Sequence, residues 1–264
     1  CVGIGPLQAV RHGCYHRSRF QSIPIALQQR SSRSLLHFMG NCNYVLLPGE
    51  PMREVFRTLG VQNTRVLHNP VPETDAKSGT EPAMNEWLFV GRISPEKGLV
   101  DLLHYWPKGE VLAVVGDGPD KPLAERIALD RQLTVRFSGQ CDGWEVHQLM
   151  SQSLGLIFPS KALEGAPLVY GEAMRASLPV IAAEGSTLAM QASADGTGAS
   201  FSWVHPESLV SAITVIRKNR AALSRRAHQV YLNRYTPEAW IDQVGELYGD
   251  VIEDHRRLKE SSAI

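Results

Sequence analysis

Apolar runs alternate with amphipathic segments through the middle of the chain. Short runs of the kind that form buried parallel strands occupy residues 87–90, 111–115, 134–137, 154–158 and 180–183. Segments with a helical spacing of apolar residues lie between them, at residues 98–105, 121–130, 144–151 and 168–176. This regular alternation predicts an α/β fold built on a doubly wound parallel sheet.

The stretch before this region has a looser pattern. We predict a strand at residues 43–47, a helix at 51–59 and a short strand at 65–67. Apolar positions also recur with a partly helical spacing between residues 21 and 39. Prolines, glycine and polar residues crowd residues 70–82, which predicts a linker between two domains.

After residue 183 the pattern becomes helical, and we predict no further strand. The predicted helices occupy residues 207–218, 220–234 and 237–258. The chain contains no internal repeat and no low-complexity tract.

The composition is that of a globular protein. Of the 264 residues, 43% are hydrophobic and 20% are charged, which is enough apolar mass to bury a substantial core. The four cysteines lack the spacing of metal ligands and are too few for a disulfide framework. No apolar run approaches the roughly 18 residues that span a bilayer, and no signal-peptide pattern is present. These features predict a cytoplasmic protein.

Charge is unevenly distributed, although the net charge is zero. Residues 1–49 carry five arginines and neither Asp nor Glu. Because the same stretch holds the apolar positions of residues 21–39, one interpretation is a basic face that contacts the inner face of a membrane or a phosphate-bearing acceptor. The other interpretation is an ordinary solvated helix face. No nucleic acid is expected as a partner, because basic and aromatic residues do not interleave in a patch.

Glycine-rich and polar motifs follow the first four predicted strands of the sheet. They contain Gly91, Arg92 and Lys97 after the first strand, Gly116 and Gly118 after the second, Gly139 and Gln140 after the third, and Glu164 after the fourth. Doubly wound sheets bind ligands at the carboxyl ends of their strands. The four motifs together therefore predict one ligand site at this edge of the sheet.

Arg92 and Lys97 supply two positive charges within one of these motifs. A planar guanidinium and a mobile ammonium are suited to holding a diphosphate, and they would take the place of a metal ion. The alternative is a surface ion pair in which Lys97 bonds Glu96 or Asp101.

Glu164 and Glu172 flank the start of the last predicted helix of the sheet region, with the spacing Glu-x7-Glu. The residues at this helix start are Gly165, Ala166, Pro167 and Leu168. Proline suits a first helical turn, and the N–H groups of that turn attract a phosphate. The two carboxylates would then hold another part of the ligand. The alternative is that they cap the helix on a solvated turn.

Three motifs occur in order along the chain. They are a Gly-Arg and a Lys-Gly pair in residues 90–98, Gly-Asp-Gly-Pro in 114–119, and Glu-x7-Glu in 164–173, which is followed by the apolar segment 177–183. Together they resemble the nucleotide-sugar domain of the retaining glycosyltransferases of family 4, the group 1 family with the two-domain GT-B fold. The resemblance covers roughly residues 84–260. It implies a complete C-terminal Rossmann-like domain and part of an N-terminal one.

The resemblance implies a role for each polar motif. Arg92 and Lys97 would bind the pyrophosphate of the donor, Glu172 the ribose hydroxyls, and Glu164 hydroxyls of the transferred sugar. Further contacts to the donor would come from Gly91, Gly116, Gly118, Gly139, Gln140, Gly165, Ala166, Pro167 and Leu168. No metal and no cofactor besides the nucleotide sugar is implied. The base is left open between uracil, guanine and adenine.

The implied reaction is transfer of a hexosyl group from a nucleotide-diphosphate sugar to a glycan or lipid-linked acceptor. It would proceed with retention of configuration and without metal, in polysaccharide biosynthesis. The two cations and the helix N-terminus would stabilise charge on the leaving diphosphate. Two alternatives stay open: a nucleotide-sugar-binding module or subunit that cannot transfer, and a nucleotide-sugar epimerase of the same fold.

The resemblance also implies a domain organisation. Residues 1–72 would belong to an acceptor-side N-terminal domain, 73–83 to a linker, 84–236 to the donor-binding domain, and 237–264 to a helix that crosses back to the N-terminal domain. Because the beginning of the acceptor domain is missing from the resemblance, we expect an N-terminally truncated chain. His12 is the nearest candidate for a histidine that touches the sugar, with a structural or solvent-facing histidine as the alternative.

Overall fold

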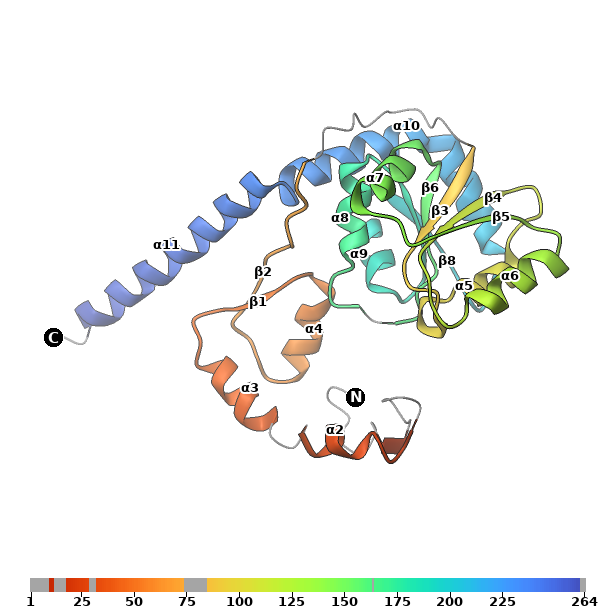
Figure 1. The fold of residues 1–264 in the computed structure, drawn as a ribbon. Coiled ribbons are helices and arrows are strands. Elements are labelled where there is room, and N and C mark those ends of the chain that lie inside the picture. The colour runs from red at the N-terminus through yellow and green to blue at the C-terminus, as the bar shows by residue number, and fades with distance from the viewer. Residues whose placement is uncertain (1–9, 12–17, 29–31, 74–84, 163, 262–264) are drawn as a thin grey trace. The chain divides into compact units, whose positions relative to one another are not determined.

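The structure is a computed structural model that describes residues 10–11, 18–28, 32–73, 85–162 and 164–261. It divides the chain into two compact units (Figure 1), of which the larger comprises His68–Gly245 and the smaller comprises Cys1–Leu67 and Glu246–Ile264. Nearly all of the predicted linker, and also His12, lie outside the described residues. The four-part domain organisation stays a prediction.

The larger unit is built on a parallel sheet of six strands. In chain order these are β3 (Glu86–Val90), β4 (Val111–Val115), β5 (Thr134–Gly139), β6 (Gly155–Phe158), β7 (Val180–Ala183) and β8 (Gly198–Phe201). Their order across the sheet is β5-β4-β3-β6-β7-β8, and all neighbours pair in parallel. The chain therefore starts in the middle, builds outward to β5, and returns past β3 to build the other half. This order reverses between β3 and β6, where doubly wound sheets bind ligands.

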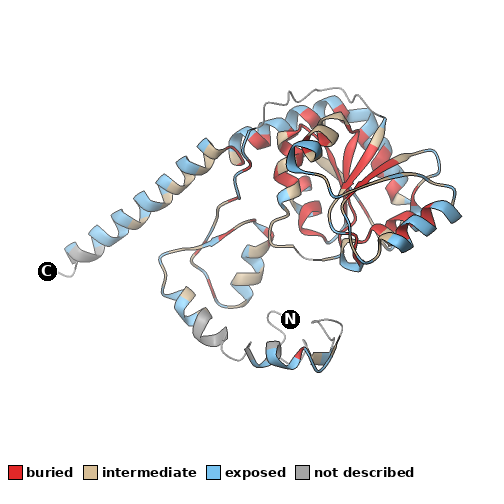
Figure 2. Cartoon of the chain, viewed as in Figure 1, coloured by how far each residue is buried: buried red, intermediate tan, exposed pale blue. Residues whose placement is uncertain are grey.

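Helices cover both faces of this sheet, as Figure 1 shows. They are α5 (Leu99–Tyr105), α6 (Lys121–Asp130), α7 (Gly143–Gln152), α8 (Leu168–Arg175), α9 (Thr187–Asp195) and α10 (Ser208–Arg234), and α11 (Pro237–Ser261) follows. The central strands are buried on both sides, as the red strands in Figure 2 illustrate. None of the helices in the described part of the chain is long and apolar enough to cross a membrane.

Successive strand residues point to opposite faces, which creates two separate hydrophobic clusters. Leu88 belongs to one cluster, whereas Trp87 and Phe89 belong to the other. The first cluster receives apolar side chains from α8, α9 and the second half of α10, and the other receives them from α5, α6 and the first half of α10. Strands β3, β4, β6 and β7 are buried on both faces for this reason, which is why their sequences read as continuous apolar runs.

Two elements of the larger unit were not predicted, and one was predicted as two. Helix α9 and strand β8 fall where we predicted neither. Helix α9 is rich in small residues and lacks a clear apolar stripe, and β8 is a four-residue edge strand. Helix α10 is continuous, whereas we predicted a break before Arg220. The guanidinium of Arg220 is buried and donates to the carbonyls of Ser153 and Leu154, at the end of α7, so this polar residue belongs to the packed face.

The smaller unit contains the elements predicted near the N-terminus. Its described elements from this part of the chain are α2 (Ile23–Gln28), α3 (Ser32–Gly40), β1 (Val45–Leu47), α4 (Pro51–Thr58) and β2 (Thr64–Val66). Strands β1 and β2 pair in parallel on either side of α4 in the sequence. The described helices α2 and α3 both fall in or at the end of the stretch 21–39, where the sequence has a partly helical pattern.

Candidate functional site

The loops that follow β3, β4 and β5 are bonded to one another through their backbones. The N–H of Gly91 donates to the Val115 carbonyl at 3.0 Å, and the N–H of Ile93 donates to the Asp117 carbonyl at 2.9 Å. The N–H of Gly116 donates to the Gly139 carbonyl at 2.6 Å. Three predicted motifs, distant in the sequence, thereby form one continuous surface.

The loops can approach each other this closely only because two of their residues are glycines. Gly116 has φ +133°, and a Cβ placed on it would lie 2.0 Å from the carbonyl oxygen of Gly91. A Cβ on Gly118 would lie 2.2 Å from the carbonyl oxygen of Ile93. Any side chain at either position would separate the loops, so the Gly-Asp-Gly sequence is required by packing as well as by the turn.

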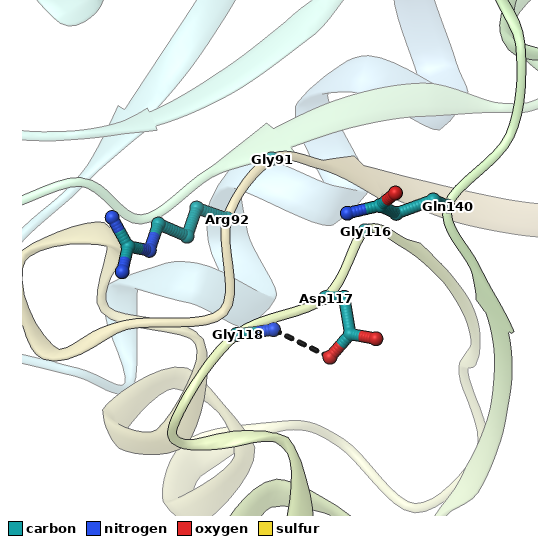
Figure 3. Close-up of a pocket in the computed structure, with 6 residues that line it drawn as sticks. All are labelled: Gly91, Arg92, Gly116, Asp117, Gly118 and Gln140. Atoms are coloured by element: carbon teal, nitrogen blue, oxygen red, sulfur yellow. Dashed lines mark hydrogen bonds between the residues drawn. The ribbon is translucent and has the colours of Figure 1, made fainter.

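These loops surround a hollow of about 530 Å³ (Figure 3). It is lined by Gly91, Arg92, Gly116, Asp117, Gly118 and Gln140. All of these except Asp117 were predicted site residues. The side chain of Asp117 accepts a hydrogen bond from the Gly118 N–H at 2.6 Å, which stabilises the turn. The exposed Arg92 side chain makes no hydrogen bond or ion pair with any residue that the structure describes, so its charge is available to a ligand.

Lys97 and Glu164 meet beside the point where the strand order reverses. Lys97 ends the short 3₁₀ turn η2 (Pro95–Lys97) after β3, and its Nζ lies 2.8 Å from Oε1 of Glu164, which follows β6. The two side chains are 27% and 20% exposed. The predicted alternative, a bond from Lys97 to Glu96 or Asp101, is wrong. Asp101 instead pairs with Lys161, and Glu96 accepts from Ser94.

Two hydroxyl groups that sequence reasoning missed hold Glu164 in place. Ser160 Oγ lies 2.8 Å from Glu164 Oε1, and Thr187 Oγ1 donates to the Glu164 carbonyl oxygen at 2.6 Å. Thr187 is the first residue of α9, after the N-cap Ser186. The Ser-Thr pair after the fifth predicted strand was a signal for this helix start.

Helix α8 begins at Leu168 with no capping side chain among the described residues. Pro167 is its N-cap and has an extended backbone, and Glu164 lies in the loop before it. Gly165 and Ala166 precede Pro167, half-buried, at the same end of the helix. The first-turn N–H groups and the positive end of the helix dipole are thus directed toward this loop.

Glu172 lies in the second turn of α8 and is half-buried. Burial raises the pKa of its carboxyl above the ordinary value, and the charge of Arg175 opposes this effect only in part. Within the described residues no hydrogen bond or ion pair reaches the Glu172 carboxylate. A partly desolvated carboxylate without hydrogen-bond donors is a costly arrangement, and it is typical of a group that binds a ligand.

A buried polar network supports the other side of α8. The hydroxyl of Tyr170 donates to Oδ2 of Asp195 at 2.8 Å, and Arg234 bonds Oδ1 of the same carboxylate at 2.5 Å. Burial and the Asp195 charge raise the pKa of Tyr170, so the phenol remains a donor. The network joins the first turn of α8 to the ends of α9 and α10.

No group of three or more His, Cys, Asp or Glu side chains in the described ranges could hold a metal ion.

Comparisons with solved structures show the same fold. The Anabaena protein HepE in complex with UDP is 20% identical with a TM-score of 0.69, over 84% of this chain and 68% of that one. A sucrose-phosphate synthase from Thermosynechococcus elongatus is 22% identical with a TM-score of 0.67, over 94% and 66%. The lipopolysaccharide outer core galactosyltransferase WaaB is 18% identical with a TM-score of 0.62, over 79% and 62%. The predicted fold class, a parallel α/β fold of the GT-B type, is confirmed.

The chain spans about two thirds of the length of these structures. No protein with a curated description matches the sequence. Residues 71–236, well over half of the chain, match the family model described as glycosyl transferases group 1. These residues contain every described element of the candidate site. The chain therefore belongs to the group 1 glycosyltransferase family.

Proposed function

We propose that the protein transfers a hexosyl group from a nucleotide-diphosphate sugar to a glycan or lipid-linked acceptor, with retention of configuration and without metal. The observation that carries this proposal is the meeting of Lys97 with Glu164 at the reversal of the strand order. Lys97 follows Arg92 in the segment after β3, and Glu164 belongs to the loop that precedes the uncapped N-terminus of α8. A cation suited to a diphosphate and a carboxylate suited to sugar hydroxyls are thus adjacent.

Each part of the donor has a matching group in this arrangement. Arg92 and Lys97 would bind the diphosphate together with the N–H groups of Gly165, Ala166 and Leu168, because all of these groups favour an anion. Glu172 would accept hydrogen bonds from the ribose hydroxyls, which relieves its unfavourable burial. Glu164 would accept from hydroxyls of the sugar. The loop containing Gln140 would contact the base.

The proposed reaction breaks the bond between the anomeric carbon and the diphosphate oxygen and forms a bond from that carbon to the acceptor oxygen. The acceptor hydroxyl attacks from the face that the diphosphate leaves, and its proton passes to the departing phosphate. Negative charge develops on the leaving group, where Arg92 and Lys97 stabilise it more in the transition state than in the ground state. No covalent intermediate between the sugar and the protein forms in this proposed reaction.

The solved neighbours agree with a nucleotide-sugar ligand. HepE has been described in complex with UDP, with UDP and glucose, and with UDP-glucose. A mutant of S. aureus TarM has been described in complex with fondaparinux, α-GlcNAc-glycerol and UDP. These ligands belong to those proteins, and they support the class of donor proposed here.

Turnover separates this proposal from a module that only binds the donor. The purified chain is incubated with UDP-, GDP- and ADP-glucose, with and without a glycan acceptor mixture, and with EDTA or Mg²⁺. We expect acceptor-dependent release of one diphosphate that EDTA does not change. Binding of a donor without any release would favour the module, and epimerisation of the donor without acceptor would favour the epimerase.

We further propose a cytoplasmic location with contact to the inner face of a membrane. Phe20, Ile23, Leu27 and Phe38, in or near α2 and α3, are exposed large apolar side chains. They lie in the stretch of residues 1–49 that carries five arginines and no acidic residue. Apolar side chains together with basic ones favour an anionic lipid surface.

A further inference from the structure

Ser160 lies between β6 and Glu164, and only 1% of its surface is exposed. Its Oγ lies 2.8 Å from Glu164 Oε1 and 3.3 Å from the Glu96 carbonyl oxygen, and it accepts from the Ala162 N–H at 3.4 Å. A serine hydroxyl has a single hydrogen to donate. That hydrogen goes to Glu164, because the distance is shorter and the acceptor is charged.

The main chain of Glu164 is held from another direction. Thr187 is 3% exposed, and its hydroxyl donates to the Glu164 carbonyl oxygen at 2.6 Å. With the backbone tied to the start of α9, the freedom left to Glu164 is rotation of its side chain. Ser160 restricts this rotation, since its own position is set by the end of β6.

The two oxygens of the Glu164 carboxylate have different surroundings. Oε1 receives hydrogen bonds from both Ser160 and Lys97. In the described part of the chain, no hydrogen bond or ion pair ends on Oε2. The carboxylate therefore has one oxygen occupied by the protein and one oxygen left for a ligand.

We infer that Ser160 is a positioning residue, which orients Glu164 so that Oε2 accepts a hydroxyl of the transferred sugar. When Lys97 turns to the diphosphate, Ser160 remains the donor that keeps Oε1 in place. The sugar is thus recognised by a carboxylate whose direction is set before the donor arrives, and less ordering is required on binding. This inference rests on the proposed function.

The test compares two ligands and two buried serines. Wild-type, Ser160→Ala and Ser94→Ala chains are titrated calorimetrically with UDP, GDP and ADP and with the glucose conjugate of the diphosphate that binds most tightly. Ser94 is the matched control, because it is 5% exposed and its hydroxyl donates to Glu96 Oε1 at 2.6 Å without reaching Glu164.

We expect Ser160→Ala to lower the affinity for the glucose conjugate about tenfold, the loss typical of a hydrogen bond to a charged group. The affinity for the diphosphate alone should fall less than about threefold. Ser94→Ala should leave the ratio of the two affinities unchanged. Ser160→Cys, which keeps the volume with a weaker donor, should give an intermediate ratio.

Equal losses for both ligands in Ser160→Ala would overturn the inference, since they would indicate a general disturbance of the fold. A selective loss in Ser94→Ala of the same size would do so as well. If Ser160→Ala binds the conjugate as tightly as wild type does, the inference about Ser160 is refuted and the proposed function is not affected. A wild-type chain that binds no diphosphate refutes the proposed function, and the inference with it.

Discussion

At the scale of single residues, the ion pair between Lys97 and Glu164 explains how a partly enclosed site can hold groups of both charges. Neither charge is left uncompensated before a donor binds, because Nζ and Oε1 are 2.8 Å apart. A diphosphate would compete with Glu164 for Lys97. Binding would then consist of an exchange of partners at Lys97, which would turn to the phosphate, while Glu164 would keep its direction and accept a sugar hydroxyl at Oε2. Ser160 keeps the carboxylate hydrogen-bonded through this exchange.

Glu172 leads to a prediction about stability and pH. Burial raises the pKa of its carboxyl, so the folded chain holds this proton more tightly than the unfolded chain does. The resulting penalty is fully present above the folded pKa and disappears as the pH falls below the unfolded value near 4.5. Glu172→Gln should therefore raise the free energy of unfolding at pH 7. The gain should be less than about 1.4 kcal/mol for each unit of the pKa shift, because solvent screens this partly exposed carboxylate.

Urea unfolding between pH 4 and pH 8 measures this effect. The gain from Glu172→Gln should shrink as the pH approaches 4, whereas Glu125→Gln, on the exposed face of α6, should have little effect at any pH. The same variant should bind diphosphates more weakly. A Glu172→Gln chain that is less stable than wild type at pH 7 would show that the carboxylate has a stabilising partner, contrary to this account.

At the scale of elements, the contacts between loops depend on glycine. Gly116→Ala places a Cβ 2.0 Å from the Gly91 carbonyl oxygen and imposes a positive φ on alanine. We expect a loss of about 2–4 kcal/mol in the free energy of unfolding, from overpacking together with backbone strain. The hollow should change with it, so diphosphate affinity should fall.

Gly143→Ala is the matched control for this substitution. Gly143 is the first residue of α7, and a Cβ added there would have no atom within 4 Å apart from its chain neighbours and the nearby backbone of its own helix. Alanine favours helix, so this variant should be as stable as wild type or slightly more so. If Gly116→Ala unfolds at the same urea concentration as Gly143→Ala, the loops do not pack as described.

Four of the strands that were predicted from the sequence are buried on both faces of the sheet. Strands β3, β4, β6 and β7 are covered on both faces, and each appears in the sequence as an apolar run. Strand β8 and helix α9 gave no such signal. Gly198 approaches the Val180 carbonyl so closely that a Cβ would lie 2.0 Å from it, which is a tertiary contact that no local pattern reveals. Edge strand β8 and helix α9 could therefore be recognised only from their neighbours, whereas the other edge strand, β5, was predicted from the sequence.

The candidate site shows the same division between local and tertiary information. The motifs placed Arg92, Lys97, Glu164 and Glu172 near one edge of the sheet, because the carboxyl ends of parallel strands lie together. Their individual contacts could not be predicted, since Lys97 bonds a residue 67 positions away. The residue roles assigned to them stay predictions.

At the scale of the whole molecule, the uneven charge leads to a prediction about membranes. The chain should sediment with vesicles that contain anionic phosphatidylglycerol and less with vesicles of neutral phosphatidylcholine. Raising the salt concentration should weaken the binding, because charges near the surface are screened. Phe20→Ser with Leu27→Ser removes two exposed apolar side chains and should reduce sedimentation without changing diphosphate affinity. Equal binding to both kinds of vesicle would contradict an electrostatic contact.

The measurement that tests the central claim most directly is calorimetric titration of the chain with UDP, GDP and ADP and with the matching nucleosides. We predict binding of one diphosphate, weakened about 10- to 100-fold by Arg92→Ala and by Lys97→Ala, with the nucleoside much less affected. Lys108→Ala, which removes an exposed lysine from outside the site, should bind as wild type does. A chain that binds no diphosphate, or variants that lose diphosphate and nucleoside equally, would contradict the proposed donor site.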